Sequence, residues 1–292
     1  MPDPDLTLPD GVLGMADRGP DWAAWVDRLP DMTRRLLGEW ELTTDGWMMH
    51  GFTALVVPVL TANDEGAVLK IAFPDDESEH EHLALQHWHG RGAARLLRAD
   101  PRRQAMLIER LHADRLTEVP DIEACEVVAG LYSRLHIPAP PQLRPLTSYV
   151  ARWTDELTAL PTAAPIPPRL VRQAVSIGRA FAADAATDGT LIHGDLHYEN
   201  VLAGDREPWL VIDPKPMSGD PHYEVAPMLW NRFEELAGGV RDGVRRRFHT
   251  IVDAAGLDEP RARDWVVFRM VCNAMGGMDA TECVAIAKAV QD

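Results

Sequence analysis

The sequence predicts an α+β fold with two lobes, a small β-rich N-terminal lobe and a larger, mainly helical C-terminal lobe. β-Branched and apolar residues fill positions 52–60 and 67–73, and the polar turn between them marks the two runs as a hairpin. In the later part of the chain, apolar residues recur at helical spacing, with one further hairpin expected at 201–212. We therefore assign residues 1–109 to the first lobe and residues 110–292 to the second.

Within the first lobe we expect a helix at 21–37, interrupted by Pro30, and a longer helix at 77–97 that is inserted between strands. A short strand at 104–109 completes the lobe. Residues 1–19 are rich in Pro, Asp and Gly and are expected to lie loosely on the surface. The helices expected in the second lobe occupy residues 122–135, 170–181, 223–238, 242–255 and 260–290.

The composition limits the partners of the protein. A formal net charge of −16 disfavours nucleic acid, because phosphate backbones need a basic surface. No apolar run approaches the roughly 18 residues that span a bilayer, so no membrane partner is expected. The N-terminus, Met1–Asp5, is acidic and lacks the basic start of a secretory signal. The three cysteines are widely spaced and odd in number, which indicates a reducing cytoplasm.

The most informative segment runs from Thr190 to Asp213. A short apolar strand precedes a polar loop that holds Asp195 and Asn200, and a predicted hairpin follows. Asp195 and Asn200 are five residues apart, which is the D-x-x-x-x-N spacing of a kinase catalytic loop. The hairpin is expected to return Asp213 to the side of Asn200, so that three oxygen-bearing side chains converge.

This pattern matches what phosphoryl transfer from ATP requires. A carboxylate must hold the attacking hydroxyl, which is the role expected of Asp195, and Asn200 and Asp213 supply oxygen ligands for Mg²⁺. In this interpretation His193 braces the loop backbone, and His197 contacts phosphate or fills space. The alternative is a metal-dependent hydrolase with His193, Asp195 and His197 as ligands, which leaves Asn200 and Asp213 without a task.

Lys70 is the candidate for a direct phosphate contact. Only three of the 29 basic residues are lysines, so a lysine within an apolar strand indicates a specific task. Its ammonium group has apolar neighbours on both sides and must therefore reach an anion or solvent. We expect Lys70 to bind the α- and β-phosphates of ATP. Glu81 on the following helix is the expected partner that steadies it, with Glu79 and Glu77 as alternatives.

The loops that would contact the nucleotide are less clearly marked. The turn-like segment 43–51 has two glycines, but neither G-x-G-x-x-G nor the Walker pattern G-x-x-x-x-G-K-[ST] is present, which excludes a P-loop fold. Glu109 and Leu111 lie where the two lobes should connect, and their backbone groups are candidates for hydrogen bonds to the edge of adenine. A Glu–Arg pair at the end of a strand, Glu109 with Arg110, is the alternative.

Four segments together resemble the aminoglycoside phosphotransferases, a family of small-molecule kinases. The loop H-G-D-L-H-Y-E-N-V-L (193–202) and the segment V-I-D-P-K-P (211–216) carry the family signature. The segments H-G-F-T-A-L-V-V-P-V (50–59) and I-E-R-L (108–111) are similar to the branch of streptomycin 6-phosphotransferases and hydroxyurea kinases. The resemblance covers roughly residues 40–290 and implies a two-lobed, protein-kinase-like fold.

The resemblance also implies a reaction and a substrate pocket. Asp195 would be the catalytic carboxylate, while Asn200 and Asp213 hold Mg²⁺ and Lys70 holds the phosphates of ATP, with GTP left open as the donor. The substrate would be a small cationic aminoglycoside, most directly streptomycin, and its phosphorylation would confer antibiotic resistance. The residues expected to shape the substrate pocket are Asp220, Glu224, Trp230, Asn231 and Arg232.

Other functions stay open from the sequence. One is a kinase of hydroxyurea or another small metabolite, and another is the metal-dependent hydrolase described above. A third is a nucleotide-binding module that has lost catalysis, although the full set of Lys70, Asp195, Asn200 and Asp213 argues against it. For all of them we expect a monomer or weak dimer in the cytoplasm.

Overall fold

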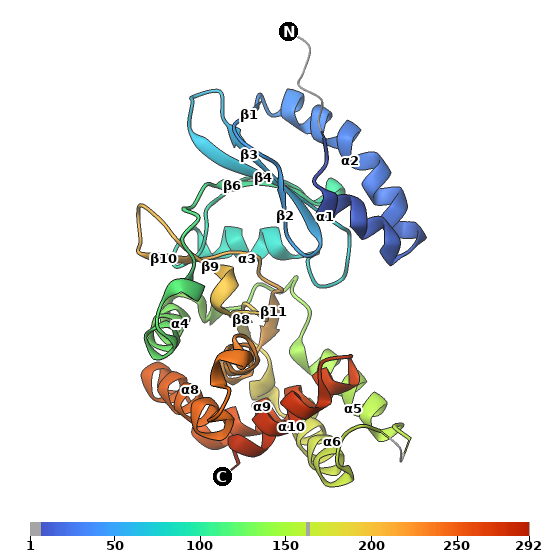
Figure 1. The fold of residues 1–292 in the computed structure, drawn as a ribbon, viewed down its shortest axis with the longest axis vertical. Helices are drawn as coiled ribbons and strands as arrows, with labels where there is room; N and C mark the ends of the chain where they lie inside the picture. The colour runs from blue at the N-terminus through green and yellow to red at the C-terminus, as the bar shows by residue number, and fades with distance from the viewer. Residues whose placement is uncertain (1–6, 162–163, 292) are drawn as a thin grey trace. The chain divides into compact units, whose positions relative to one another are not determined.

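The computed structural model describes residues 7–161 and 164–291, so the expectation about Met1–Asp5 lies outside the described residues. The chain divides into two compact units (Figure 1). The first contains the described residues up to Gly90 together with Ala94–Leu111, and the second contains Arg91–Ala93 and the described residues from His112 onward. The sequence alone predicts one division after residue 109, without this short excursion.

An antiparallel sheet forms the centre of the first unit. In the described part of the chain it has six strands in the order β1-β3-β4-β6-β5, and β2 pairs separately with β3. The strands are β1 (Thr43–Thr44), β2 (Met49–His50), β3 (Ala54–Leu60), β4 (Gly66–Ala72), β5 (Leu96–Asp100) and β6 (Ala105–Glu109). The predicted hairpin is the β3–β4 pair, whose register runs from Ala54 opposite Ala72 to Leu60 opposite Gly66.

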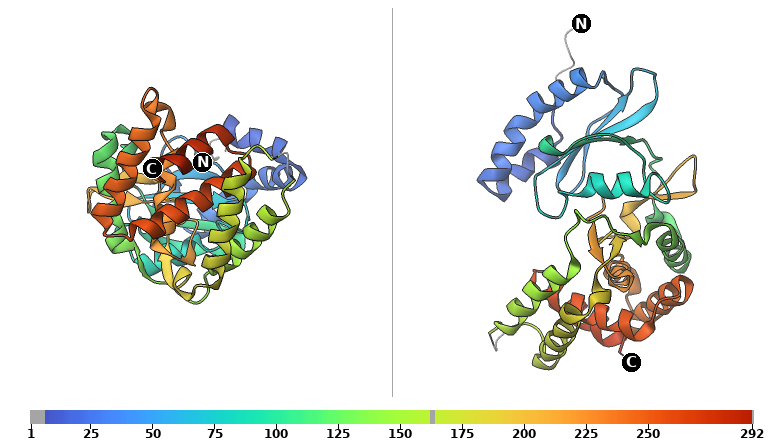
Figure 2. Two further views of the ribbon diagram at one scale, coloured as in Figure 1. Left: turned by 90° about the horizontal axis from the view of Figure 1, so that it is seen from below. Right: turned by 180° about the vertical axis from the view of Figure 1, so that it is seen from behind.

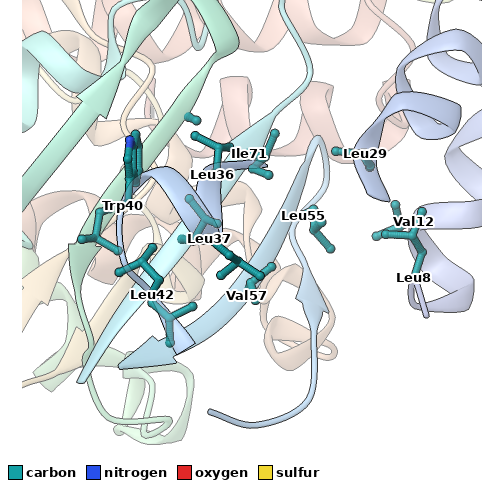
Figure 3. Packing of buried hydrophobic residues seen from close by; sticks show 14 of the residues in the cluster. Leu8, Val12, Leu29, Leu36, Leu37, Trp40, Leu42, Leu55, Val57 and Ile71 are labelled. Atoms are coloured by element: carbon teal, nitrogen blue, oxygen red, sulfur yellow. The ribbon is translucent and has the colours of Figure 1, made fainter. Parts of the chain in front are cut away.

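Helices cover both faces of this sheet. The helical elements are α1 (Asp10–Leu13), the 3₁₀ turn η1 (Gly14–Arg18), α2 (Pro20–Glu39), α3 (Glu81–Trp88) and the 3₁₀ turn η2 (Pro101–Arg103). Figure 3 shows Leu36 and Leu37 of α2 against Val57 of β3 and Ile71 of β4, all members of one buried apolar cluster. The other face meets α3, because Lys70 on β4 bonds Glu81 on that helix.

Two predictions for the N-terminal region are wrong. α2 runs through Pro30 without interruption, since the buried side chains of Trp25 and Leu36 hold the turns on both sides of the proline against the sheet. Residues 10–18, part of the stretch expected to lie loosely, are not loose. They form α1 and η1, because Val12 and Met15 lie three residues apart and bury their side chains on the same helical face.

The inserted helix is also shorter than predicted. α3 ends at Trp88, and the chain then adopts left-handed conformations at His89 (φ 52°), Gly90 (φ 77°) and Gly92 (φ 70°). Such residues stop an α-helix, and glycine adopts this conformation without strain. Leu96, predicted to be helical, is consequently the first residue of β5.

The second unit is mainly helical. Its helices are α4 (Asp121–Leu135), α5 (Leu146–Thr158), α6 (Pro168–Ala183), α7 (Pro227–Trp230), α8 (Val240–Ala255), α9 (Glu259–Met275) and α10 (Ala280–Ala289). Its 3₁₀ turns are η3 (Leu116–Glu118), η4 (Ala185–Thr187), η5 (Tyr198–Asn200), η6 (Pro221–Val225) and η7 (Phe233–Leu236). α9 packs against α6 and α10, α4 packs on α8, and α5 packs on α6 (Figure 2). In the described ranges, no helix has the length and apolar character needed to cross a membrane.

Two of the predicted C-terminal helices differ from the structure. The segment 223–238 contains only the short helix α7 and 3₁₀ turns, since Arg232 (φ 55°) and Gly238 (φ 87°) turn the chain into left-handed conformations. The helix predicted at 260–290 is divided into α9 and α10, because Gly277 (φ 106°) cannot continue a helix.

Short strands position the polar loop of the second unit. β7 (Ile137–Pro138), β8 (Thr190–Ile192) and β11 (Met217–Gly219) form one sheet, in the order β11-β8-β7. β9 (Val201–Ala203) and β10 (Trp209–Val211) form the second predicted hairpin, with Val201 opposite Val211. Residues 91–93 lie along β10, where the N–H of Val211 donates to the carbonyl of Gly92 at 2.9 Å. The polar loop 193–200 therefore connects two small β-structures.

Candidate active site

Lys70 lies in the middle of β4, between β3 and β6. Its side chain is nearly buried, with the residue 8 % exposed, and Nζ donates to both carboxylate oxygens of Glu81 at 2.7 Å. Glu81 begins α3 and is 1 % exposed, whereas the alternative partners Glu79 and Glu77 are exposed. Burial of a charge is unfavourable unless bonded partners compensate it, and Glu81 does so here. The carboxylate proposed from the sequence thus holds the Lys70 ammonium group in one position.

The backbone of Glu109 is partly used within the sheet. Its N–H donates to the carbonyl of Arg95 at 2.9 Å, and its side chain accepts the N–H of Arg95 at the same distance. Arg110, considered above as a partner of Glu109, forms its ion pair with Asp45. The N–H of Glu109 is therefore already bonded, and the contact of the Glu109 and Leu111 backbone with adenine stays a prediction.

The segment that joins β1 to β3 presents large apolar side chains to solvent. Trp47 is 92 % exposed and Phe52 is 79 % exposed. The guanidinium of Arg18 lies 4.3 Å from the centre of the Phe52 ring and donates to the carbonyl of Phe52 at 2.7 Å. The N-terminal helical region thereby fixes one end of this segment, whose contact with phosphate stays a prediction.

His193 begins the polar loop of the second unit and is fully buried. Its Nε2 lies 2.9 Å from the carbonyl oxygen of Ile212, and its Nδ1 lies 3.3 Å from the nitrogen of Asp195. A carbonyl can only accept, so Nε2 carries the proton and Nδ1 accepts the N–H of Asp195. Burial lowers the pKa of His193, which disfavours the protonated ring. This ring connects the start of the loop to the end of β10, which is the brace predicted from the sequence.

Gly194 allows two stretches of backbone to approach closely. It has φ 83°, and a Cβ atom at this position would overlap the carbonyl oxygen of Lys215. The N–H of Lys215 donates to the carbonyl of His193 at 2.8 Å, so the two segments are bonded as well as close. Only glycine combines this conformation with this contact.

Asp195 and Asn200 are bonded to each other across the loop. The side-chain nitrogen of Asn200 donates to the carbonyl of Asp195 at 2.8 Å, and the N–H of Asn200 donates to the carbonyl of His197. This bond uses the nitrogen of the amide and leaves its oxygen as the group suited to a cation. The Asp195 side chain is 36 % exposed, so its carboxylate is accessible to a substrate.

The hairpin returns Asp213 to the neighbourhood of Asn200. The N–H of Ile212 donates to the carbonyl of Asn200 at 2.9 Å, and Asp213 follows directly. The Asp213 side chain is 34 % exposed, and its backbone has φ 55°. An L-residue in the left-handed region carries strain that often marks a functional position. One carboxylate oxygen and one amide oxygen fit the hard-donor preference of Mg²⁺.

Lys215 is a candidate active-site residue that we did not predict from the sequence. Its Nζ lies 3.6 Å from a carboxylate oxygen of Asp213, and its side chain is 19 % exposed. The signal was present in the sequence, because the scarcity of lysine that drew attention to Lys70 applies equally to Lys215.

The sequence model of one protein family, the aminoglycoside/hydroxyurea antibiotic resistance kinases, matches residues 39–279. The chain belongs to this kinase family. A streptomycin 6-kinase of Streptomyces griseus is 37 % identical over 299 residues, which cover 98 % of this chain and 97 % of the relative. A hydroxyurea phosphotransferase of Kitasatospora aureofaciens is 43 % identical over 86 % of this chain and 74 % of its own length. The protein is therefore a small-molecule kinase, as the sequence motifs predicted.

Solved structures confirm the predicted protein-kinase-like fold. A thermostable mutant of an aminoglycoside phosphotransferase, in a ternary complex with ADP and hygromycin B, aligns with a TM-score of 0.58 at 17 % identity. The alignment covers 88 % of this chain and 97 % of that chain. Membership of the kinase family also removes the main reason to consider a metal-dependent hydrolase. Within the described residues, no three His, Cys, Asp or Glu side chains gather to hold a metal ion.

In this kinase, Asp220 does not face a pocket as a substrate ligand would. It is 1 % exposed, and its carboxylate accepts bonds from His222, Arg261 and Trp265 at 2.6 Å each. Asp220 is thus a buried structural acceptor, and the substrate role expected from the sequence is not compatible with these contacts. The Asp220 carboxylate can stay buried in the protein interior because several donors bond to it.

Glu224 is likewise enclosed. It is fully buried, its Oε1 accepts the N–H of Gly194 at 2.6 Å, and its Oε2 lies 2.9 Å from Nε2 of His136. These bonds lower the pKa of Glu224 against the opposing effect of burial, which is the larger single influence. A role in contacting substrate does not fit this position. Glu224 instead binds the backbone directly before Asp195.

The remaining candidates lie at the end of α7 and after it. Trp230, Asn231 and Arg232 are half-buried. Arg232 forms a doubly bonded ion pair with Glu235 and donates to the carbonyl of Val119 at 3.0 Å, so its charge is already compensated. Asn231 donates to the carbonyl of Pro227. The ring of Trp230 lies 4.8 Å from the guanidinium carbon of Arg269, and its contact with substrate stays a prediction.

Proposed function

We propose that the protein transfers the γ-phosphoryl group of ATP to a hydroxyl of an aminoglycoside, and that streptomycin is the substrate. One observation carries this proposal, the match of 98 % of the chain to a streptomycin 6-kinase over nearly the whole length of that relative. It is supported by the bonds that join Asn200 to Asp195 and to Ile212, because they keep the segments that carry Asp195, Asn200 and Asp213 next to each other.

The residues have separate tasks in the proposed reaction. Asp195 orients the hydroxyl and accepts its proton as the new oxygen–phosphorus bond forms and the bond to the departing ADP breaks. Asn200 and Asp213 hold Mg²⁺, which neutralises charge on the phosphates when bound. Lys70, held in place by Glu81, binds the α- and β-phosphates. The loose transition state needs little base strength, so orientation is the main contribution of Asp195.

The proposed substrate and setting agree with the charge of the protein. A chain with net charge −16 attracts a cationic drug. Phosphorylation would add about −1.5 to −2 charges to the drug and weaken its binding to anionic ribosomal RNA, which is how resistance would arise. We place this activity in the cytoplasm, where ATP and ribosomes are, with the protein acting as a monomer or weak dimer. ATP is the proposed donor, and a direct competition assay with GTP tests that choice.

Hydroxyurea is the second candidate substrate. It is favoured by one specific observation, the 43 % identity to a hydroxyurea phosphotransferase. Purified protein should be assayed for ADP formation with streptomycin, with other aminoglycosides and with hydroxyurea. Turnover of hydroxyurea without turnover of streptomycin would replace the first candidate by the second, and no transfer to any hydroxyl acceptor would refute both.

The role of Asp195 is tested by replacing its carboxylate with an amide. Asp195→Asn should lower kcat for streptomycin by at least about 100-fold, in line with the usual effect of removing a positioned acid or base. The thermal midpoint should hardly change, since the side chain is 36 % exposed. Asp205→Asn is the matched control, because that side chain in the β9–β10 turn is 94 % exposed. Equal activity of the two variants would contradict the assignment.

A further inference from the structure

Arg269 is a buried cation beside the catalytic loop. It projects from α9 and is 8 % exposed. One guanidinium nitrogen donates to the carbonyl of Tyr223 at 3.0 Å, and another donates to the carbonyl of Gly194 at 3.3 Å. The guanidinium carbon also lies 3.8 Å from the centre of the Tyr223 ring and 4.8 Å from the centre of the Trp230 ring. The Arg269 side chain thus contacts Gly194 in the polar loop, Tyr223 in η6, and the ring of Trp230, which is a predicted substrate residue.

The surroundings of Arg269 are unusual for a buried charge. Burial of an ion is strongly unfavourable unless it is paired and hydrogen-bonded. In the described chain its hydrogen-bond acceptors are two backbone carbonyls, and no carboxylate there forms an ion pair with it. Two aromatic faces supply the remaining stabilisation. A residue that only filled space at this position could be apolar, so the charge indicates a task that depends on those carbonyls and rings.

The carbonyl of Gly194 belongs to the peptide that leads into Asp195. The N–H of the same peptide is accepted by Nδ1 of His193 at 3.3 Å. Arg269 and His193 therefore hold opposite ends of one peptide group, while Glu224 holds the preceding N–H at 2.6 Å. Since this peptide group fixes the position of the Asp195 Cα, from which the side chain extends, the position of its carboxylate depends on these bonds.

We propose that Arg269 is a positioning residue that fixes the Gly194–Asp195 peptide and the Trp230 ring relative to each other. It rests on the proposed function, in which Asp195 orients the acceptor hydroxyl. Trp230 is half-buried and is the aromatic residue predicted above to contact the acceptor, and Arg269 connects its ring to the peptide before Asp195. The flat fork of arginine donors is required, because lysine offers a point charge that cannot serve two carbonyls and two rings together.

The test compares two arginine-to-lysine changes on the same helix. In Arg269→Lys, kcat for phosphorylation of streptomycin should fall by at least about tenfold, since small misplacement of a reacting group has large effects on rate. KM for ATP and the slow hydrolysis of ATP without acceptor should stay within about twofold, because neither depends on the hydroxyl held by Asp195. Arg263→Lys is the control. Arg263 pairs with Glu259 and donates to the carbonyl of Val290, away from the loop.

A second variant approaches the same link from the aromatic side. In Trp230→Leu, Arg269 can still bond to both carbonyls. This second test therefore does not depend on whether the Arg269→Lys variant folds. Trp230→Leu should raise KM for streptomycin by at least about tenfold, a larger change than in KM for ATP, because Lys70 and Glu81 hold the phosphates of ATP in the proposed reaction. Wild-type KM for streptomycin in this variant, or wild-type kcat in Arg269→Lys, would overturn the inference. Parallel loss of ATP hydrolysis and transfer in Arg269→Lys would overturn it too, because it indicates general damage.

The proposed function fails separately from this inference. If the wild-type protein transfers phosphate to neither streptomycin nor hydroxyurea, the proposed reaction is wrong and the inference falls with it. If the wild type is active and Arg269→Lys retains its kcat, only the positioning role of Arg269 is wrong.

Discussion

Asp213 combines an accessible carboxylate with a left-handed backbone at φ 55°. Asparagine tolerates this conformation about as well as aspartate, whereas β-branched residues do not. Asp213→Asn therefore separates the charge of the side chain from the shape of the turn. The Mg²⁺ concentration for half-maximal activity should rise at least about tenfold, because ligand charge tunes the affinity for divalent cations. The measurement is a Mg²⁺ titration of initial rates, with urea unfolding as the control. An unchanged titration would remove Asp213 from the metal site.

Lys70 and Glu81 form a buried pair whose structural and functional roles can be separated. Glu81→Leu alone removes the carboxylate that neutralises Lys70 and should destabilise the protein by about 3–5 kcal/mol. Lys70→Met together with Glu81→Leu should restore most of that stability, because no uncompensated charge is left buried. The double variant should nevertheless lose affinity for ATP. Urea unfolding and nucleotide titration measure the two effects, and full ATP affinity in the double variant would show that Lys70 does not bind phosphate.

For single residues, the sequence predicted chemical roles more reliably than it predicted burial. Asp195, Asn200 and Asp213 could be singled out because their spacing is tied to a reaction. Asp220 and Glu224 could not be judged correctly, since an acidic residue in a pocket and one bonded inside the fold look alike in sequence. The difference lies in partners such as Trp265 and His136, which are distant in the chain.

The close approach of the backbone at Gly194 to the backbone at Lys215 involves the whole stretch between β8 and β11, which includes the β9–β10 hairpin. Gly194→Ala would place a Cβ atom against the carbonyl of Lys215 and would force the left-handed conformation on an L-residue. We expect stability to fall by more than the roughly 1–2 kcal/mol of backbone strain alone, and kcat to fall at least about tenfold as Asp195 moves.

Gly189→Ala is the control for this prediction. Gly189 also has a positive φ of 107°, but nothing lies within 4 Å of the position of a Cβ atom there. It should therefore show the strain without the collision and should keep its kcat. Urea unfolding and initial rates measure both variants, and equal losses would mean that the close approach to Lys215 is unimportant.

Most elements with a local signal were predicted, but α5 was missed although Leu146, Val150 and Leu157 recur at helical spacing. The β3–β4 and β9–β10 hairpins follow from apolar runs around turn residues, and both are present. The continuity of α2 through Pro30 depends on the sheet beneath it, which a local proline rule ignores. β11 was missed because three residues, Met217–Gly219, carry no periodic pattern and are held by pairing with β8.

Stability as a function of pH is a property of the whole molecule, and buried His193 gives it a definite direction. Burial lowers the folded-state pKa of His193 below its ordinary value of 6.5. The unfolded chain then binds a proton that the folded chain does not, so stability is present above pH 6.5 and is lost as pH falls toward the folded pKa. A single such proton changes the unfolding free energy by at most about 1.4 kcal/mol per pH unit.

Urea unfolding at pH 7.5 and pH 5.5 tests this expectation. The wild-type protein should be less stable at the lower pH, and His193→Asn, although less stable overall, should show a smaller difference. His82, whose pKa burial also lowers, is present in both proteins and serves as an internal constant. The same pH dependence in both would exclude His193 as its source. Below about pH 4.5 a further loss is expected, because Asp220 and Glu224 have lowered pKa values.

The family match begins at residue 39, yet α1, η1 and nearly all of α2 precede it. These helices supply one side of the apolar cluster around Leu55, Val57 and Ile71. A shortened protein that contained only residues 39–279 would expose that apolar face of the β-sheet to water and would tend to self-associate. The position where the family model begins and the position where the chain could be shortened are therefore different, and the second is set by the outermost side chain that the core still needs.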